Sequence, residues 1–162
     1  MRNLHPGNNL ISFNIDLPFN SVLDVFENLN NSATYVIGEG VAANQISPGF
    51  WAGSLQNLEV GSGYWVNVNE DRLLYLYGEA SDRNAAYQIH SNANLLSFPF
   101  NYPTSVPDAF SNLTESELSN ITGVIGEGVA ANQISPGFWV GSLQNLEAGS
   151  GYWVMSASSE NI

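Results

Sequence analysis

The stretch that decides the fold is VIGEGVAANQISPGFWAGSLQNLEVGSGYWV at residues 36–66, which returns as VIGEGVAANQISPGFWVGSLQNLEAGSGYWV at residues 124–154. The copies lie 88 positions apart. Only two pairs of residues differ, Ala52/Val140 and Val60/Ala148. Nearly identical sequences build nearly identical surfaces, so any site in one copy is expected in the other. The duplication therefore favours two equivalent sites over one asymmetric catalytic centre.

The similarity continues more loosely outside this block. Residues 10–15 match 95–100, and residues 21–29 match 105–113, with offsets of 85 and 84 instead of 88. Small insertions therefore separate the matched elements. The period exceeds the roughly 20 to 50 residues of solenoid repeats. We therefore predict two modules, not a superhelix: module 1 at residues 1–77, a polar linker at 78–85 and module 2 at 86–162.

Composition limits the classes of partner. The chain has 162 residues, with fifteen acidic side chains against three arginines and no lysine, and a formal net charge of −12. Nucleic acid and anionic lipid would be repelled by this charge. There is no cysteine, which excludes disulfides and thiolate metal sites. No stretch approaches the roughly 20 apolar residues of a membrane helix, and the amino terminus lacks the apolar core of a signal peptide.

Local patterns predict a mainly β fold with short helices, so that the α+β character is minor. Apolar and polar residues alternate over 10–16, as in a half-buried strand. Val22, Phe26 and Leu29 have the spacing of one helical face, with Ser21 as N-cap. Pro107, near the start of the matching helix, is tolerated there. We expect one short helix in each module, and the two pseudosymmetric modules to pack together.

Further elements are predicted within the repeated block. Ser47-Pro48-Gly49 places proline and glycine as a type II turn requires, so a hairpin is expected there. Residues 54–59 are expected to form a single helical turn that ends at Gly61. A strand is expected at 64–68.

The closing strand differs between the modules in this prediction. Residues 73–77 are expected to close module 1, whereas Ile162 aligns with Leu74. The last strand of module 2 is therefore expected to be missing. A fragment of a longer chain would explain this, and so would completion of the open edge by strand addition from a neighbouring molecule.

Each copy resembles a β-rich module that recurs in surface and secreted proteins of aquatic bacteria and in proteins of marine phages. The motifs that carry the resemblance are NLISF at 9–13, GEGVAA at 38–43, WxGSLxxL at 51–58 and GxGYWV at 61–66. They cover nearly the whole chain, twice. The resemblance implies a noncatalytic part of a larger surface or virion protein. It also implies an extracellular, cell-surface or virion location.

Aromatic side chains are the first candidates for binding. Tyr64, Val66 and Val68 share one face of their strand, whereas Trp65 lies on the polar face. Exposed tryptophan and tyrosine rings are suited to stacking on sugars, but burial of such rings also stabilises a small core. Both packing and glycan binding stay open. The candidate aromatic residues are Trp51, Tyr64 and Trp65, with Trp139, Tyr152 and Trp153 in the second copy.

Acidic residues are the second candidates. Glu39 and Glu127 lie between glycines, and Glu59 and Glu147 follow the expected helical turn. A carboxylate pair could serve a glycosidase, but solvated charges or turn acids bound to backbone are the preferred interpretation. No Asp-x-Asp-x-Asp-Gly calcium loop occurs. We therefore predict no catalytic residue, metal or cofactor, and retain Glu39 and Glu127 only as candidate binding residues.

His5 and His90 precede Leu10 and Leu95 at equivalent positions, so they are interpreted as a repeat feature and not as a catalytic pair. No nucleophile elbow, zinc-protease motif or phosphate-binding loop is present. We expect a noncatalytic structural or adhesive module that acts through protein contacts or self-assembly. A bivalent carbohydrate-binding module, whose two weak sites gain strength together, is the alternative.

Overall fold

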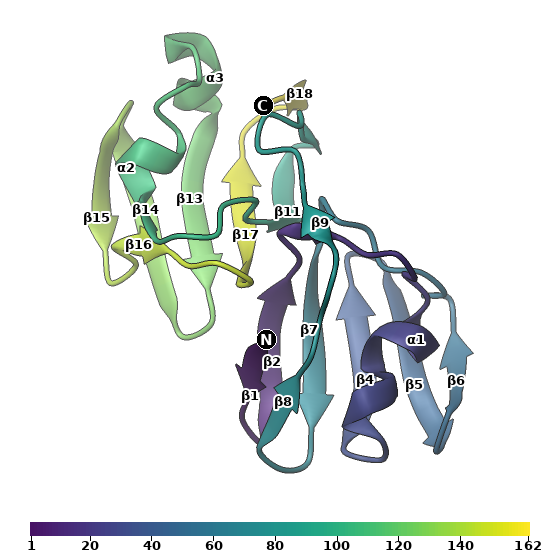
Figure 1. Ribbon diagram of the computed structural model, residues 1–162. Helices are drawn as coiled ribbons and strands as arrows, with labels where there is room; N and C mark the ends of the chain where they lie inside the picture. The colour runs from purple at the N-terminus through teal and green to yellow at the C-terminus, as the bar shows by residue number, and fades with distance from the viewer.

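The computed structural model describes all residues, 1–162, and is mainly β with short helices. Two five-stranded antiparallel sheets of the same strand order lie side by side (Figure 1). This confirms the predicted fold class of two pseudosymmetric modules packed together. No helix of the chain has the length and apolar character needed to cross a bilayer.

Each sheet is built from one module. Across the sheet of module 1 the order is β2 (Gly7–Ser12), β7 (Gly63–Val68), β4 (Ala33–Gly38), β5 (Val41–Ser47) and β6 (Phe50–Gly53). Module 2 repeats this order with β11 (Asn92–Ser97), β17 (Gly151–Ser156), β13 (Ile121–Gly126), β14 (Val129–Ser135) and β15 (Phe138–Gly141). Strands β2 and β11 therefore form one edge of their sheets, and β6 and β15, which follow the proline-glycine turns, form the other.

Short strands complete both modules. In module 1, β1 (Arg2–Leu4) pairs with β8 (Arg72–Leu74), and β3 (Ile15–Asp16) pairs with β9 (Glu79–Ala80). In module 2, β10 (Gln88–Ile89) pairs with β18 (Glu160–Asn161), and β12 (Thr104–Ser105) pairs with β16 (Asn145–Leu146). Because β9 pairs within module 1, part of the predicted linker belongs to that module.

The structure corrects the prediction that module 2 lacks its closing strand. Strand β18 is the counterpart of β8, and Tyr87 and Ile162 add two backbone hydrogen bonds at its end. The expected strand at 73–77 was too long, because β8 ends at Leu74.

The helices begin where the sequence predicts. Helix α1 (Val22–Phe26), continued by the 3₁₀ helix η1 (Glu27–Leu29), is capped by the Ser21 hydroxyl, which accepts the Asp24 N–H. Ser105 caps α2 (Val106–Ala109) in the same way, with Pro107 in the first turn. Module 2 also has α3 (Glu115–Asn120), which was not predicted.

The helical turn predicted at residues 54–59 does not form. The N–H groups of Leu55 and Leu58 donate to Ala42 and Asn20, not to carbonyls of their own segment. Both leucine side chains are buried. The segment is therefore an irregular strap whose apolar residues are held by neighbouring elements.

Each module has its own core between the sheet and the helix. The strand phase predicted for β7 is confirmed, since Tyr64, Val66 and Val68 are buried and Trp65 is only partly so. The core of module 1 contains sixteen buried residues and that of module 2 eleven. Module 2 therefore has fewer fully buried apolar residues in its core and more partly buried ones packed against it.

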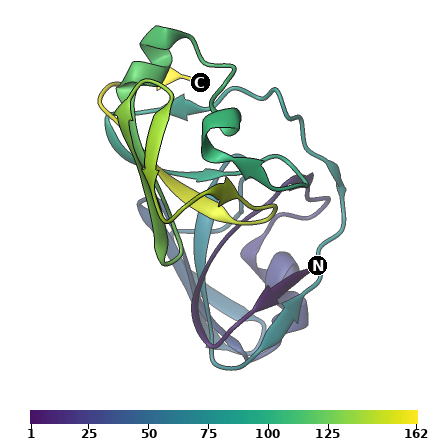
Figure 2. The ribbon, with the colours of Figure 1, turned by 90° about the vertical axis from the view of Figure 1, so that its left-hand side faces the viewer.

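The modules meet through β2 and β7 of the first and β11 and β17 of the second (Figure 1). The chain after β8 runs along one side of the molecule from module 1 to module 2 (Figure 2). Leu10 and Leu95 are nearly fully buried but belong to neither core. These equivalent leucines therefore fill the contact between modules.

Candidate functional site

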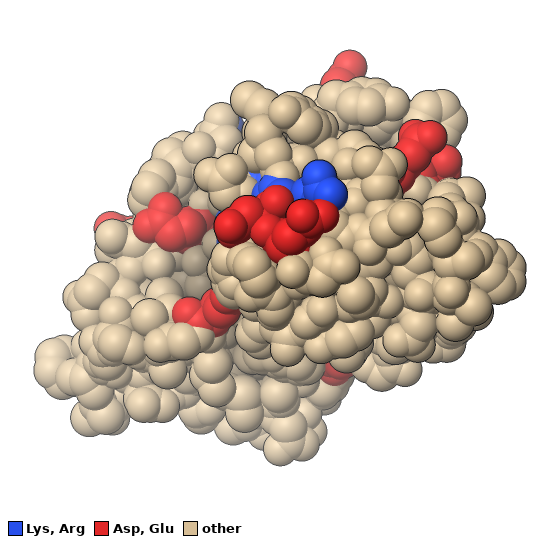
Figure 3. All heavy atoms as spheres, turned by 90° about the horizontal axis from the view of Figure 1, so that it is seen from below, with Lys and Arg blue, Asp and Glu red and all other residues tan.

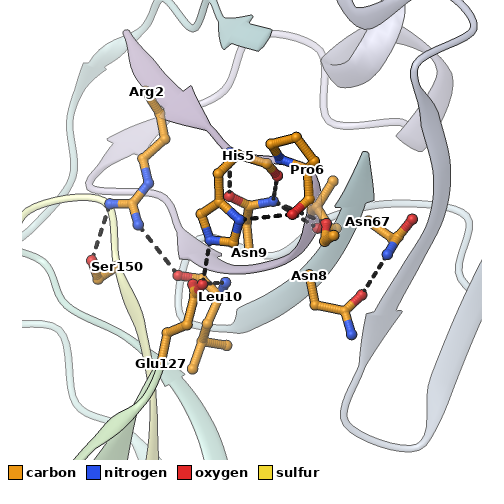
Figure 4. Close-up of polar contacts among 11 residues, drawn as sticks. Arg2, His5, Pro6, Asn8, Asn9, Leu10, Asn67, Glu127 and Ser150 are labelled. Atoms are coloured by element: carbon orange, nitrogen blue, oxygen red, sulfur yellow. Dashed lines mark hydrogen bonds and ion pairs between the residues drawn. The ribbon is translucent and has the colours of Figure 1, made fainter. Parts of the chain in front are cut away.

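The repeated glutamate Glu127 contacts the opposite module. It lies in the turn between β13 and β14, and its Oε2 accepts the Leu10 N–H at 2.8 Å. Its Oε1 lies 2.5 Å from Nε2 of His5. Figure 4 shows this carboxylate between the histidine ring and the backbone of β2. The candidate binding residue is thus engaged within the protein.

Glu39 makes the mirrored contact. It lies in the turn between β4 and β5, and its Oε2 accepts the Leu95 N–H at 2.8 Å while Oε1 contacts His90 Nε2. The equivalent histidines therefore belong to two copies of one contact. We call these two contacts, Glu127 with His5 and Leu10 and Glu39 with His90 and Leu95, the reciprocal glutamate contacts. Chain separations of 122 and 51 residues between glutamate and histidine kept them out of reach of local sequence patterns.

Further backbone bonds cover the same sheet edges. The Ser12 N–H donates to the Gly149 carbonyl at 2.9 Å, and the Ser97 N–H donates to the Gly61 carbonyl at 3.1 Å. An edge strand with unpaired N–H groups is a template for pairing with other chains. Here module 2 covers the edge strand β2 of module 1, and module 1 covers the edge strand β11 of module 2.

Glycine allows the two strands to approach at the centre of this contact. A methyl group on Gly151 would lie 2.7 Å from the Ile11 carbonyl oxygen, and one on Gly63 would lie 2.9 Å from the Leu96 carbonyl oxygen. Both values are shorter than real Cβ contacts. The second glycine of each repeated GSG sequence is therefore required by packing between the modules.

Both histidines are placed to carry a proton. In His5, Nδ1 lies 3.0 Å from the Pro6 carbonyl oxygen while Nε2 faces Glu127. His90 faces the Ser91 carbonyl and Glu39 in the same way. Neutral imidazole has one N–H and satisfies one acceptor, whereas imidazolium satisfies both. The pKa of each histidine is raised above its usual value, mainly by the hydrogen bond with the backbone carbonyl and next by the hydrogen bond with the glutamate.

Arg2 breaks the symmetry between the modules. Its guanidinium donates to Ser150 Oγ at 3.0 Å (Figure 4). It also donates to the Ala148 carbonyl at 3.3 Å. Burial lowers the pKa of Arg2, although Glu127 partly offsets this. The equivalent residue in module 2 is Tyr87, whose hydroxyl lies 2.9 Å from Ser97 Oγ. Arg2 therefore bonds across to the other module, whereas the hydroxyl of the equivalent tyrosine bonds within its own module.

Four of the six candidate aromatic residues pack against the cores. The hydroxyls of Tyr64 and Tyr152 are buried and accept the N–H groups of Glu59 and Glu147 at 2.7 Å. Trp51 packs against the module 1 core beside Phe26, with ring centroids 6.1 Å apart. Trp139 stacks on Phe110 at 5.3 Å. The two tyrosine rings are buried in the cores, and the two tryptophans, which are partly buried, pack against them.

Trp65 and Trp153 are partly exposed and lie on the faces of their sheets that point away from the cores, but their surroundings differ. Near Trp65, the Tyr35 hydroxyl and the Asn67 amide donate to Asn8 Oδ1 at 2.6 and 2.7 Å. The strand register places Gly123, Met155 and Ala93 at the three equivalent positions of module 2. The polar and aromatic face suited to a glycan therefore occurs once, not twice.

The repeated turn between β5 and β6 exposes apolar side chains. Ile46 is 63% exposed and Phe50 57% exposed, and Ile134 and Phe138 are 63% and 58% exposed. We call these two hairpin ends, residues 46–50 and 134–138, the apolar tips. Both lead into the edge strands β6 and β15, whose outer sides pair with no other strand. The turns themselves were predicted from proline and glycine, but the exposure of the flanking isoleucine and phenylalanine was not.

The remaining acidic residues form no compact cluster. Glu59 and Glu147 are exposed, and no group of three or more His, Asp or Glu side chains is arranged to hold a metal ion. On the face drawn in Figure 3, acidic side chains form several separate groups and basic ones are few. The turn glutamates are backbone-bound, as the preferred interpretation expected, although the backbone is that of the other module.

Comparison of the chain with protein-family models, with curated proteins and with solved structures found no match.

Proposed function

We propose that this protein is a noncatalytic structural or adhesive module of a cell-surface or virion assembly, acting through protein contacts. The observation that carries the proposal is the pair of apolar tips, which place the same exposed isoleucine and phenylalanine at matching ends of two rigid modules. Large exposed apolar groups gathered at one place are typical of contact surfaces. The reciprocal glutamate contacts join the two modules that carry the tips.

The use of the repeated residues supports the same proposal. The turn glutamates and histidines engage one another, and the tyrosines and two of the four tryptophans pack in the cores. Of the large apolar side chains in the repeated block, those of the tips are the most exposed in both copies. A duplicated, rigid presentation of one surface suits a role in bivalent attachment.

The proposal can be tested by measuring whether the protein self-associates through the apolar tips. Sedimentation velocity over a wide range of concentration is expected to show association that Phe50→Ser combined with Phe138→Ser abolishes. Phe19→Ser is the matched control, because Phe19 is 65% exposed but lies outside the tips. A strict monomer at the highest concentration, unchanged by either variant, would remove the self-assembly form of the proposal.

The alternative is carbohydrate binding at Trp65. The polar residues around this ring favour it in module 1, and their replacement in module 2 makes one site the expectation. On a glycan array, Trp65→Ala should then abolish binding that Trp153→Ala leaves intact. Equal loss in both variants, or no binding by the wild type, would count against this alternative.

A further inference from the structure

Strands β6 and β15 lie at the two outer edges of the molecule, one on each module (Figure 1). Residues 40–58 and 128–146, which include these strands, contain no charged side chain, although the chain has a formal net charge of −12. Two copies of the chain therefore repel each other least where these segments meet. Charged side chains commonly protect exposed edge strands from pairing, and both of these edges are without them.

The strand register shows which backbone groups of β15 point outward. The Ala130 carbonyl accepts the Leu143 N–H at 3.0 Å, so the backbone groups of Ala130 point toward the β15 side of β14. Backbone direction alternates along an antiparallel strand, so those of Asn132 also point toward β15, where its partner is Val140. The N–H and carbonyl of Trp139 therefore point away from the sheet, and a further strand can pair with them.

The side chains of β15 are complementary to those of a second β15 strand. Trp139 packs against the module 2 core, so Phe138 and Val140 lie on the outer sheet face, where they are 58% and 43% exposed. In an antiparallel pair of two β15 strands centred on Trp139, Phe138 of each copy lies opposite Val140 of the other. Aromatic and β-branched residues in opposite positions stabilise a strand pair.

The two modules differ at this edge. Strand β6 has Ala52 at the position of Val140, which is one of only two differences within the repeated block. In a pair of β6 strands, Phe50 would lie opposite an alanine, and less apolar surface would be buried. The larger apolar contact is therefore available at β15.

The hairpin that carries β15 is also held at more points than its counterpart. Gln133 Oε1 accepts the Gly137 N–H at 2.8 Å, and its Nε2 donates to the Leu118 carbonyl of α3 at 2.7 Å. The counterpart in module 1, Gln45, donates to the Asn30 carbonyl at 3.0 Å and does not bond to its own turn. A segment that is already held in its paired conformation loses less conformational entropy on association.

We propose that β15 of one chain pairs antiparallel with β15 of a second copy, centred on Trp139, so that the module 2 sheets of two chains form one continuous sheet. The pairing rests on the proposed role in assembly and names the partner as a second copy of this chain. Main-chain hydrogen bonds and the outward phenylalanine and valine side chains together supply the affinity. Because both chains use the same strand, the expected product is a dimer in which both copies of β6 remain exposed.

Sedimentation velocity of the 162-residue protein tests which edge pairs. The wild type is expected to form a dimer as its concentration rises. Val140→Ala should raise the dissociation constant of the dimer by about tenfold, because apolar contact is lost in both copies. Val140→Lys should abolish the dimer, since a charge on an edge strand prevents pairing. The matched control is Ala52→Lys at the equivalent position of β6, which should leave the dimer intact.

Cysteine cross-linking tests the register of the pair. The chain has no cysteine of its own, so Phe138→Cys and Val140→Cys chains can be mixed under mild oxidation. A disulfide between the two variants should form faster than a disulfide within either variant, because positions 138 and 140 lie opposite each other in the proposed pair. Equal rates for the three products would overturn the proposal.

The variants also separate failure of this pairing from failure of the proposed function. Association that survives Val140→Lys but is lost in the variant with both Phe50→Ser and Phe138→Ser would overturn the β15 pairing and leave association through the tips standing. A dimer that is lost in Ala52→Lys and retained in Val140→Lys would place the contact at β6 and would also overturn the proposal. A strict monomer at the highest concentration would overturn the pairing together with the self-assembly form of the proposed function.

Discussion

Removing one turn glutamate measures what the reciprocal glutamate contacts contribute. In Glu127→Ala the Leu10 N–H, in a residue 1% exposed, loses its acceptor, and His5 loses its partner. A hydrogen bond to a charged group contributes about 1.5–3 kcal/mol. Because the Glu127 side chain is 33% exposed, water replaces part of this, and we expect the lower end, about 1.5 kcal/mol.

Thermal unfolding followed by tryptophan fluorescence is the assay. For a chain of this size 1 kcal/mol corresponds to about 2–4 °C, so Glu127→Ala should lower the melting temperature by about 3–6 °C. Glu39→Ala should have a similar effect, because its contact has the same geometry. The double variant should lose roughly the sum, within about 0.5 kcal/mol.

The matched controls are the other repeated glutamates. Glu59→Ala and Glu147→Ala remove exposed carboxylates and should stay within about 0.5 kcal/mol of the wild type. A loss in these controls as large as in Glu127→Ala would refute the reasoning. So would an unchanged melting temperature in the Glu39, Glu127 double variant.

Three further predictions concern the histidines, the central glycines and the tryptophans. The folded protein raises the pKa of both histidines, so the stability that they contribute is complete below the unfolded pKa of about 6.5 and is lost as the pH rises through the folded pKa. The melting temperature of the wild type should therefore exceed that of a double histidine-to-glutamine variant by more at acid pH than at alkaline pH. Gly151→Ala should cost about 1–3 kcal/mol in chemical denaturation, because the new methyl group meets backbone, whereas Gly61→Ala meets only a side chain at 3.8 Å and should cost less. Trp139→Ala should destabilise more than Trp153→Ala, since Trp139 stacks in the core and Trp153 lies on the outer sheet face; the reverse order in urea unfolding would show that the packing is misassigned.

Much of the fold follows from local sequence because local forces decide it. The alternation of apolar and polar residues in 64–68 places three side chains in the core, and this alternation can be read from the local sequence alone. Ser21 and Ser105 cap their helices with their own hydroxyls. The duplication then supplies the second module without further reasoning.

Two errors have different causes. The spacing of Leu55 and Leu58 resembles a helical face, but their backbone N–H groups bond to other elements, so tertiary contacts override the local pattern. Helix α3 could have been predicted: the offset grows from 84 to 88 before β13, and Thr114 with Glu117 forms the capping box that starts the helix.

The candidate site was harder to predict because it depends on how two modules meet. A glutamate between glycines indicates a turn acid, but nothing local says that its acceptor sites face Leu10 or Leu95 of the other module. Likewise, the identical motifs around Trp65 and Trp153 conceal different neighbours, which come from less similar strands outside the repeated block.

The reciprocal glutamate contacts also have a consequence for copy number. Each module donates one glutamate turn and accepts one at its edge strand, so two modules satisfy each other completely and leave neither group free. Pairing of this kind closes on itself, as at a twofold axis. A single module would have to find a second one to become complete, and a chain with an odd number of such modules would always present one unpaired edge, through which chains would join two by two.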